Sequence, residues 1–118
     1  MAVHTELGKL GEELAVSYLT QKGYAVLHRN WRYARFELDI IAEKNDILHF
    51  VEVKLRSSSE GPAPEENVTK KKIEFLLRAV DQFLFLHPQY KHFQLDILSI
   101  TRTGDQEAAY FMIEDIYV

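Results

Sequence analysis

Two carboxylates and a lysine lie inside two short segments that are otherwise apolar and β-forming. Asp39 interrupts the run Phe36–Ala42, and Glu52 and Lys54 belong to the run Phe50–Lys54. Strands favour branched and aromatic side chains, and burying a charge without a partner is costly. Carboxylates beside a lysine are groups with which a metal-dependent phosphodiesterase holds a hard cation and acts on a phosphate. We therefore expect a metal-dependent phosphodiesterase site here.

The two segments are expected to pair as an antiparallel hairpin around Asn45-Asp46. In that register Asp39 faces Glu52 across the hairpin, and Lys54 projects to the same side because side chains alternate along a strand. Opposed Cβ atoms lie ~5 Å apart, where two carboxylates repel by roughly 3 kcal/mol at an effective dielectric near 20. A divalent cation such as Mg²⁺ would relieve that repulsion, and the lysine would stabilise charge on a phosphate or help to deprotonate a water.

A simpler interpretation stays open for each of these residues. The hairpin face could be solvated, with Glu37 and Lys54 forming an ordinary cross-strand ion pair. Glu12 shares a helical stripe with small and apolar residues, which indicates either a contribution to the site or an ordinary surface position.

Composition bounds the class of protein. The chain has 118 residues, of which 47% are hydrophobic, and this size and composition predict one globular domain over residues 1–118. It has no cysteine, which excludes disulfides, thiolate nucleophiles and cysteine-bound zinc. The N-terminus lacks the features of a signal peptide and no apolar run is long enough to span a membrane, so we expect a cytoplasmic protein without membrane contact.

Charge gives a mixed indication. The net charge of −4 is not typical of a nucleic-acid-binding protein. Basic residues nevertheless cluster around Trp31 and over Lys70–Lys72. Each cluster is either a phosphate-binding surface or a set of solvated charges, those around Trp31 at a sheet edge. No phosphate-binding loop or dinucleotide fingerprint is present, so no nucleotide cofactor is expected.

Periodicity and turn residues predict the elements that position these groups. The first helix is expected over Glu6–Lys22 and stops at Gly23. The second is expected to be capped by Asn67 and to end near His87-Pro88, with an apolar surface so wide that it is either sandwiched or part of a dimer interface. Strands are predicted over Tyr24–Tyr33, Glu37–Glu43, Ile47–Leu55, Phe93–Ile100 and Ala109–Val118, with a loop over Ser57–Asn67. The order α-β-β-β-α-β-β predicts an α/β fold with a mixed five-stranded sheet flanked by helices.

Several segments carry a resemblance to a known family. They are Gly11-Glu12 with Ala15, Arg29-Asn30-Trp31-Arg32, Glu37-Leu38-Asp39-Ile40-Ile41-Ala42, Val51-Glu52-Val53-Lys54-Leu55-Arg56, and Val68-Thr69 with Lys72. Spanning nearly the whole chain, they resemble the small bacterial YraN-type proteins, which are similar to Holliday junction resolvases among the restriction-endonuclease-like PD-(D/E)xK nucleases. The chain departs from the family pattern at Phe36, where glycine is usual, and at Gln94, where arginine is usual.

The resemblance implies a restriction-endonuclease-like fold and hydrolysis of DNA phosphodiester bonds, including those of branched junctions, with Mg²⁺ or Mn²⁺. It implies a catalytic set of Asp39, Glu52, Lys54 and Glu12, in which the three acidic residues bind the metal. The expected nucleic-acid contacts are Arg29, Arg32, Arg56 and Lys72. A junction resolvase needs two symmetric cuts and is expected to be a homodimer. The alternative is a catalytically inactive module of the same fold that binds nucleic acid or a protein partner.

Overall fold

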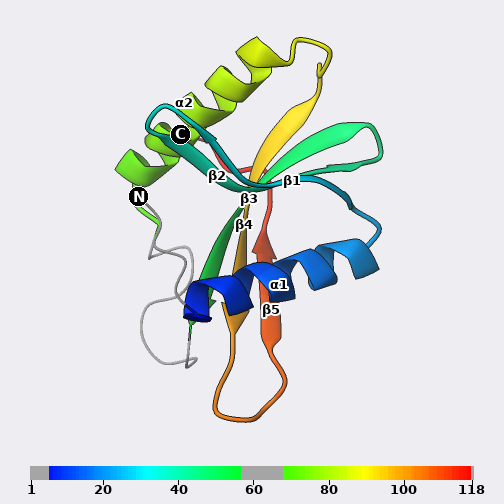
Figure 1. Cartoon of the computed structure of the whole chain (residues 1–118), viewed down its shortest axis with the longest axis vertical. Helices are drawn as coiled ribbons and strands as arrows, with labels where there is room; N and C mark the ends of the chain where they lie inside the picture. The colour runs from blue at the N-terminus through cyan, green and yellow to red at the C-terminus, as the bar shows by residue number, and fades with distance from the viewer. Residues whose placement is uncertain (1–5, 57–67, 118) are drawn as a thin grey trace.

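Five strands form one mixed sheet against which two helices pack, over the residues that this computed structural model describes, 6–56 and 68–117 (Figure 1). The helices are α1 (Glu6–Gln21) and α2 (Lys70–Leu86). The strands are β1 (Ala25–Tyr33), β2 (Phe36–Lys44), β3 (Ile47–Arg56), β4 (Phe93–Thr101) and β5 (Ala109–Ile113). The predicted element order and the mixed α/β sheet are confirmed, while the last strand ends at Ile113 and does not reach Val118.

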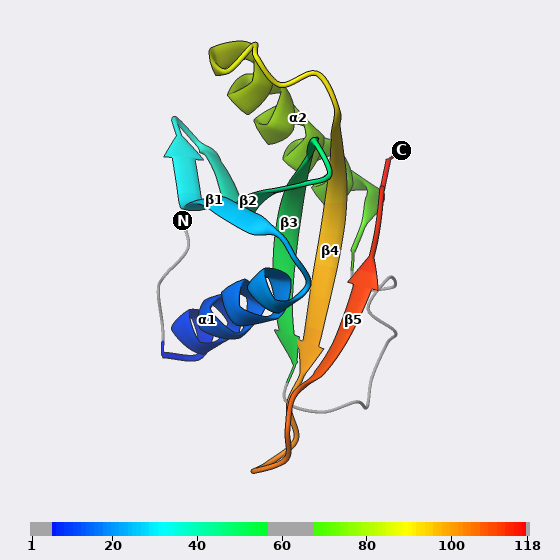
Figure 2. The same ribbon diagram turned by 90° about the vertical axis from the view of Figure 1, so that its right-hand side faces the viewer.

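The strands lie in the order β1-β2-β3-β4-β5. Three neighbouring pairs are antiparallel, and β3 pairs with β4 in parallel because α2 provides the crossover that a parallel connection needs. In Figure 2, β3, β4 and β5 run side by side, whereas β1 and β2 project to one side of them. The sheet is therefore divided into a three-stranded part and a hairpin that leaves it.

Local turn chemistry explains where several elements end. Gly23 follows α1 with a φ of +94°, a conformation that glycine adopts without strain. Asn45 and Asp46 have φ values of 54° and 64°, as the two central residues of a type I′ hairpin turn require. This turn sets the predicted register of the hairpin, which runs from Lys44↔Ile47 to Ile40↔Val51.

The cap of α2 differs from the prediction. The helix begins at Lys70, and its N-cap is Thr69, whose hydroxyl accepts a hydrogen bond of 3.1 Å from the backbone N–H of Lys72. The predicted cap, Asn67, was wrong because threonine caps as well and lies directly before the first helical residue. Asn67 and the predicted loop Ser57–Asn67 lie outside the described residues. In the part of the chain that the structure describes, neither helix is long and apolar enough to cross a membrane.

Two apolar clusters cover the two faces of the sheet. We call the face packed against α2 the α2 face; Phe50 and Phe83 lie in its cluster and their rings are 5.5 Å apart. The opposite, α1 face packs Ala15 and Leu19 of α1 on Ile40 of β2. Alternation along β3 then assigns even-numbered residues such as Phe50 to the α2 face. Glu52 and Lys54 follow Phe50 on that face.

Candidate functional site

The strands β2 and β3 part at Asp39. Their ladder ends at the pair Ile40↔Val51, and the Asp39 carboxylate accepts the next backbone N–H, that of Val53, at 2.9 Å. A side chain thus replaces a ladder bond that the backbone of β2 no longer makes. The predicted register is correct, but Asp39 and Glu52 do not continue the ladder; they meet through their side chains at the point where the strands separate.

The carboxyl groups of Asp39 and Glu52 are neighbours, close enough for the charge of Glu52 to act on Asp39. Glu52 is buried and Asp39 is half-buried. Burial raises the pKa of the Asp39 carboxyl to about 7, with a further contribution from the negative charge of Glu52, while the Val53 N–H acts in the opposite direction. This arrangement differs from the solvated hairpin face that the simpler interpretation predicted, because water is largely removed from both groups.

Two ammonium groups from different elements flank Glu52. The Nζ of Lys72 in α2 lies 3.5 Å from Glu52 Oε2, and the Nζ of Lys54 lies 4.0 Å from the same oxygen. The side chains of Lys54 and Lys72 are 37% and 42% exposed, so each pair is worth at most about 1 kcal/mol, and both ammonium groups remain accessible to a ligand. Lys72, predicted to contact nucleic acid, also lies beside the carboxylates.

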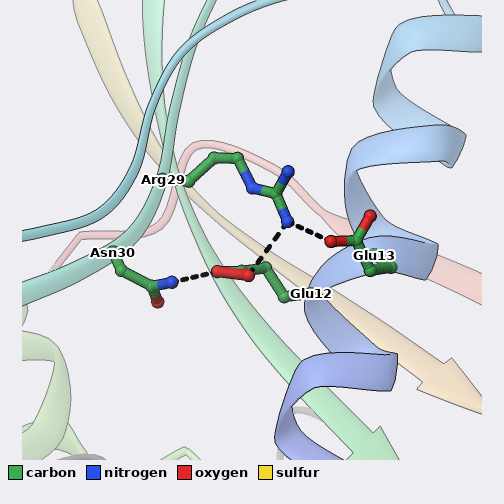
Figure 3. A network of polar contacts seen from close by, with 4 residues as sticks. All are labelled: Glu12, Glu13, Arg29 and Asn30. Atoms are coloured by element: carbon green, nitrogen blue, oxygen red, sulfur yellow. Dashed lines mark hydrogen bonds and ion pairs between the residues drawn. The ribbon is translucent and has the colours of Figure 1, made fainter. Parts of the chain in front are cut away.

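Glu12 is held by strand β1 (Figure 3). One of its carboxylate oxygens accepts a hydrogen bond from Arg29 at 3.0 Å, and the other accepts one from the Asn30 amide. Arg29 also donates to Glu13 at 2.6 Å. Glu12 is therefore neither a free surface residue nor grouped with Asp39 and Glu52. Among the described residues, no three His, Asp or Glu side chains are close enough together to hold a metal ion.

The arginines predicted to bind nucleic acid have protein partners. Arg29 pairs with Glu12 and Glu13, and Arg32 lies 3.5 Å from Glu37. Among the described ion pairs, Glu37 is therefore matched with Arg32 instead of the Lys54 that the simpler interpretation expected. Both arginines lie on β1, an outer strand of the described sheet, where their charges also discourage pairing with a further strand.

Arg56 ends β3 at a half-buried position. Its carbonyl accepts a hydrogen bond of 2.9 Å from the backbone N–H of Arg102. The departure at Phe36 has a structural reason, because this ring packs against the Phe75 ring at 5.6 Å and joins the cluster on the α2 face. A glycine at this position would leave part of that cluster uncovered.

A buried His–Asp pair was not predicted. His49 Nδ1 lies 2.7 Å from Asp96 Oδ2, and the other Asp96 oxygen accepts hydrogen bonds of 2.9 Å from the Gln94 amide and from the Asp115 backbone N–H. Tyr24 covers the ring of His49 edge-on at 4.9 Å. The hydrogen bonds described for this pair tie β3, β4 and the segment after β5 together, so we interpret it as structural. The sequence signal for this pair was Asp96, a charged residue inside the apolar run that forms β4.

The structure brings together two carboxylates, one of them with a raised pKa, and two lysines. They lie at the point where β2 separates from β3. A hard divalent cation such as Mg²⁺ is bound in many proteins by only one or two carboxylates and retains several waters, so Asp39 and Glu52 fit such an ion without a third acidic ligand. A bound cation would also counteract the two causes that keep the Asp39 pKa high, burial first and then the negative charge of Glu52.

The family model and the relatives found by comparison with known proteins agree on one family. Residues 11–100 match the model of the "Uncharacterised protein family UPF0102". A UPF0102 protein of Flavobacterium psychrophilum is 41% identical over 100 residues, covering 85% of this chain and 84% of that protein. One from Flavobacterium johnsoniae is 40% identical over 123 residues, covering 99% of this chain and 98% of that protein. One from Bacteroides thetaiotaomicron is 48% identical over 97 residues, covering 82% and 75% respectively.

Proposed function

We propose that this protein, which belongs to the UPF0102 family, is a metal-dependent endonuclease that hydrolyses phosphodiester bonds of DNA. The observation that carries the proposal is the proximity of the Asp39 and Glu52 carboxyl groups at the point where β2 leaves β3, with Asp39 held there by the Val53 N–H. Two half-buried or buried carboxylates in contact destabilise a fold unless a proton or a cation lies between them. A binding site for a cation gives this arrangement a use.

Asp39 and Glu52 would hold Mg²⁺ or Mn²⁺, which would supply charge neutralisation at a phosphate and an acidified water as nucleophile. The Val53 N–H fixes the orientation of the Asp39 carboxylate by a hydrogen bond of 2.9 Å. Because Val53 lies between Glu52 and Lys54, this one bond ties β2 to the part of β3 that carries both groups. The site thus rests on backbone geometry and not on a loop, which favours a fixed arrangement of the carboxylates.

The two lysines would act on the phosphate. Lys54 and Lys72 lie within 4.0 Å of Glu52 and neutralise it. Occupation of Glu52 by a cation would leave both ammonium groups available to the negative charge that develops on the phosphate. Lys70 and Lys71 are exposed in the same helical turn as Lys72 and extend the basic surface next to the site. This surface is where we propose that the DNA backbone lies.

A restriction-endonuclease-like fold is part of the proposal. It is supported by the element order, by the mixed sheet, and by a candidate site at the separation of two neighbouring strands. Resolution of a four-way junction would need two copies of this site, so we propose a homodimer as the active form on such DNA.

Cleavage of defined DNA substrates tests the proposal. Wild-type protein is expected to cut labelled DNA in Mg²⁺ or Mn²⁺ and not in EDTA, with branched, nicked and linear duplexes compared in parallel. Glu52→Ala, prepared identically, is expected to cut none of them. Cleavage that persists unchanged in Glu52→Ala would come from a contaminant or from another site and would refute the assignment.

Replacing Lys72 by Gln is expected to lower the cleavage rate by about tenfold to a hundredfold, because one of two cations beside Glu52 is lost. Lys71→Gln is the matched control, since this substitution removes the same charge from an exposed position one residue away. Equal effects of the two substitutions on initial rates would show that only the overall charge of the helix matters.

The second candidate is an inactive module that binds nucleic acid or a protein. It is favoured by one observation, that Glu52 already has two lysine partners and so needs no cation to be tolerated. Affinity for DNA that falls steeply with salt, without metal-dependent cleavage, would support nucleic-acid binding. Affinity for DNA that does not change with salt would favour a protein partner.

A further inference from the structure

Asn30 interrupts the regular course of β1. It has a φ of 53°, in the left-handed region that few residues other than glycine adopt and that asparagine tolerates better than most. The strand nevertheless continues through it, because Arg29 pairs with Ile40 and Trp31 pairs with Leu38. Such a conformation inside a strand needs a local reason.

The left-handed residue breaks the alternation of side chains along the strand. Arg29 and Asn30 are consecutive, yet both donate to Glu12 on α1, whereas Trp31 packs in the cluster on the α2 face. In a regular strand two consecutive side chains point to opposite faces, so they could not meet one carboxylate. The conformation of Asn30 is what brings both donors to Glu12.

This interruption lies next to the candidate site. Asp39 lies between Ile40 and Leu38 on β2, so its strand position is across from that of Asn30. Glu12 is thereby held against β1 at the strand position that faces Asp39, although its carboxylate is not grouped with Asp39 and Glu52 in the part of the chain described. Its side chain is only 17% exposed, which limits its exchange with bulk water.

We propose that Arg29 and Asn30 are positioning residues that keep Glu12 next to the metal site and withhold it from the metal until one binds. This inference rests on the proposed function, in which Asp39 and Glu52 hold the ion. Glu12 then releases Asn30 and Arg29 and serves as a third carboxylate. Because the held state competes with metal binding, it lowers the apparent metal affinity.

Glu13 gives Arg29 a second partner. The Arg29–Glu13 distance of 2.6 Å is shorter than the 3.0 Å to Glu12, and the Glu13 side chain is 66% exposed. When Glu12 leaves, Arg29 stays paired with Glu13, so its guanidinium keeps a carboxylate partner. Glu13 therefore lowers the cost of releasing Glu12, although its own carboxylate contacts neither Asp39 nor Glu52 in any described interaction.

Calorimetric titration with Mn²⁺ alone, at about pH 8 where Asp39 is ionised, tests the proposal. Asn30→Gly keeps the charge and permits the left-handed backbone but removes the amide, and it is expected to tighten Mn²⁺ binding about three- to tenfold. Asn45→Gly is the matched control, because Asn45 has the same left-handed φ of 54° in an exposed turn. It is expected to leave the Kd unchanged.

Glu13→Gln supplies an independent test on a surface residue whose replacement leaves the core intact. It is expected to weaken Mn²⁺ binding about threefold, and this effect is expected to vanish in the Arg29→Gln background. A loss that is equal in both backgrounds would reflect the general charge of the surface and would overturn the role of Glu13. Mn²⁺ binding that is unchanged or weakened in Asn30→Gly would overturn the proposal that Glu12 is withheld from the metal. Wild-type protein that binds no Mn²⁺, even with DNA, would instead refute the proposed function itself.

Discussion

Replacing Asp39 by Asn is expected to lower metal-dependent DNA cleavage by about 10²- to 10³-fold while the protein remains folded. Asparagine has the same shape, and its side-chain oxygen can still accept the Val53 N–H that now binds Asp39 at 2.9 Å. What is lost is the negative charge that would hold the cation. Initial rates on labelled DNA, over a range of Mn²⁺ concentrations, measure the effect.

The control for this substitution is Asp81→Asn, which removes the same charge from an exposed position on α2. Its rate is expected to match that of the wild type. Cleavage by Asp39→Asn at the wild-type rate would show that Asp39 is not a metal ligand. The proposed mechanism would then fail at its first residue.

The stability of the metal-free protein is expected to fall between about pH 4 and pH 7 because of Asp39. Its pKa in the folded protein is raised to about 7 from its ordinary value of 3.8, mainly by burial and then by Glu52. Within this range the folded state binds a proton that the unfolded state has lost, so raising the pH favours unfolding. Above about pH 7 the loss is complete, at on the order of 4 kcal/mol.

Asp39→Asn removes this group and isolates its contribution from those of other titrating residues. Urea unfolding at about pH 5 and pH 8 is expected to show that the stability gained by the variant is larger at the higher pH. Glu52→Gln is expected to reduce the pH dependence without abolishing it, since burial remains as the larger cause. An equal stability difference at the two pH values would contradict the raised pKa of Asp39.

The hairpin could be predicted from sequence because local chemistry determines it. Asn45-Asp46 favours the left-handed φ values of the turn, and the turn then sets the register from Lys44↔Ile47 onward. The end of the ladder could not be predicted in the same way. It depends on where β2 diverges from β3, which leaves no mark in the spacing of residues 36–56.

Contacts between elements that are distant in the sequence could not be predicted either. Lys72 reaches Glu52 only because the crossover helix packs on the α2 face with its first turn beside β3. Asn30 lies in a segment that looks like an ordinary strand, and its left-handed φ becomes meaningful only when Glu12 is in place. His49 and Asp96 are 47 positions apart in sequence, and they meet because β3 and β4 pair in parallel.

Calorimetric titration of the wild-type protein with Mn²⁺, in the presence of DNA and at about pH 8, tests most directly whether Asp39 and Glu52 form a metal site. A metal site formed by these residues predicts saturable binding in the wild type and loss of that binding in both Asp39→Asn and Glu52→Gln. Absence of binding in the wild type, or unchanged affinity in the two variants, would contradict it.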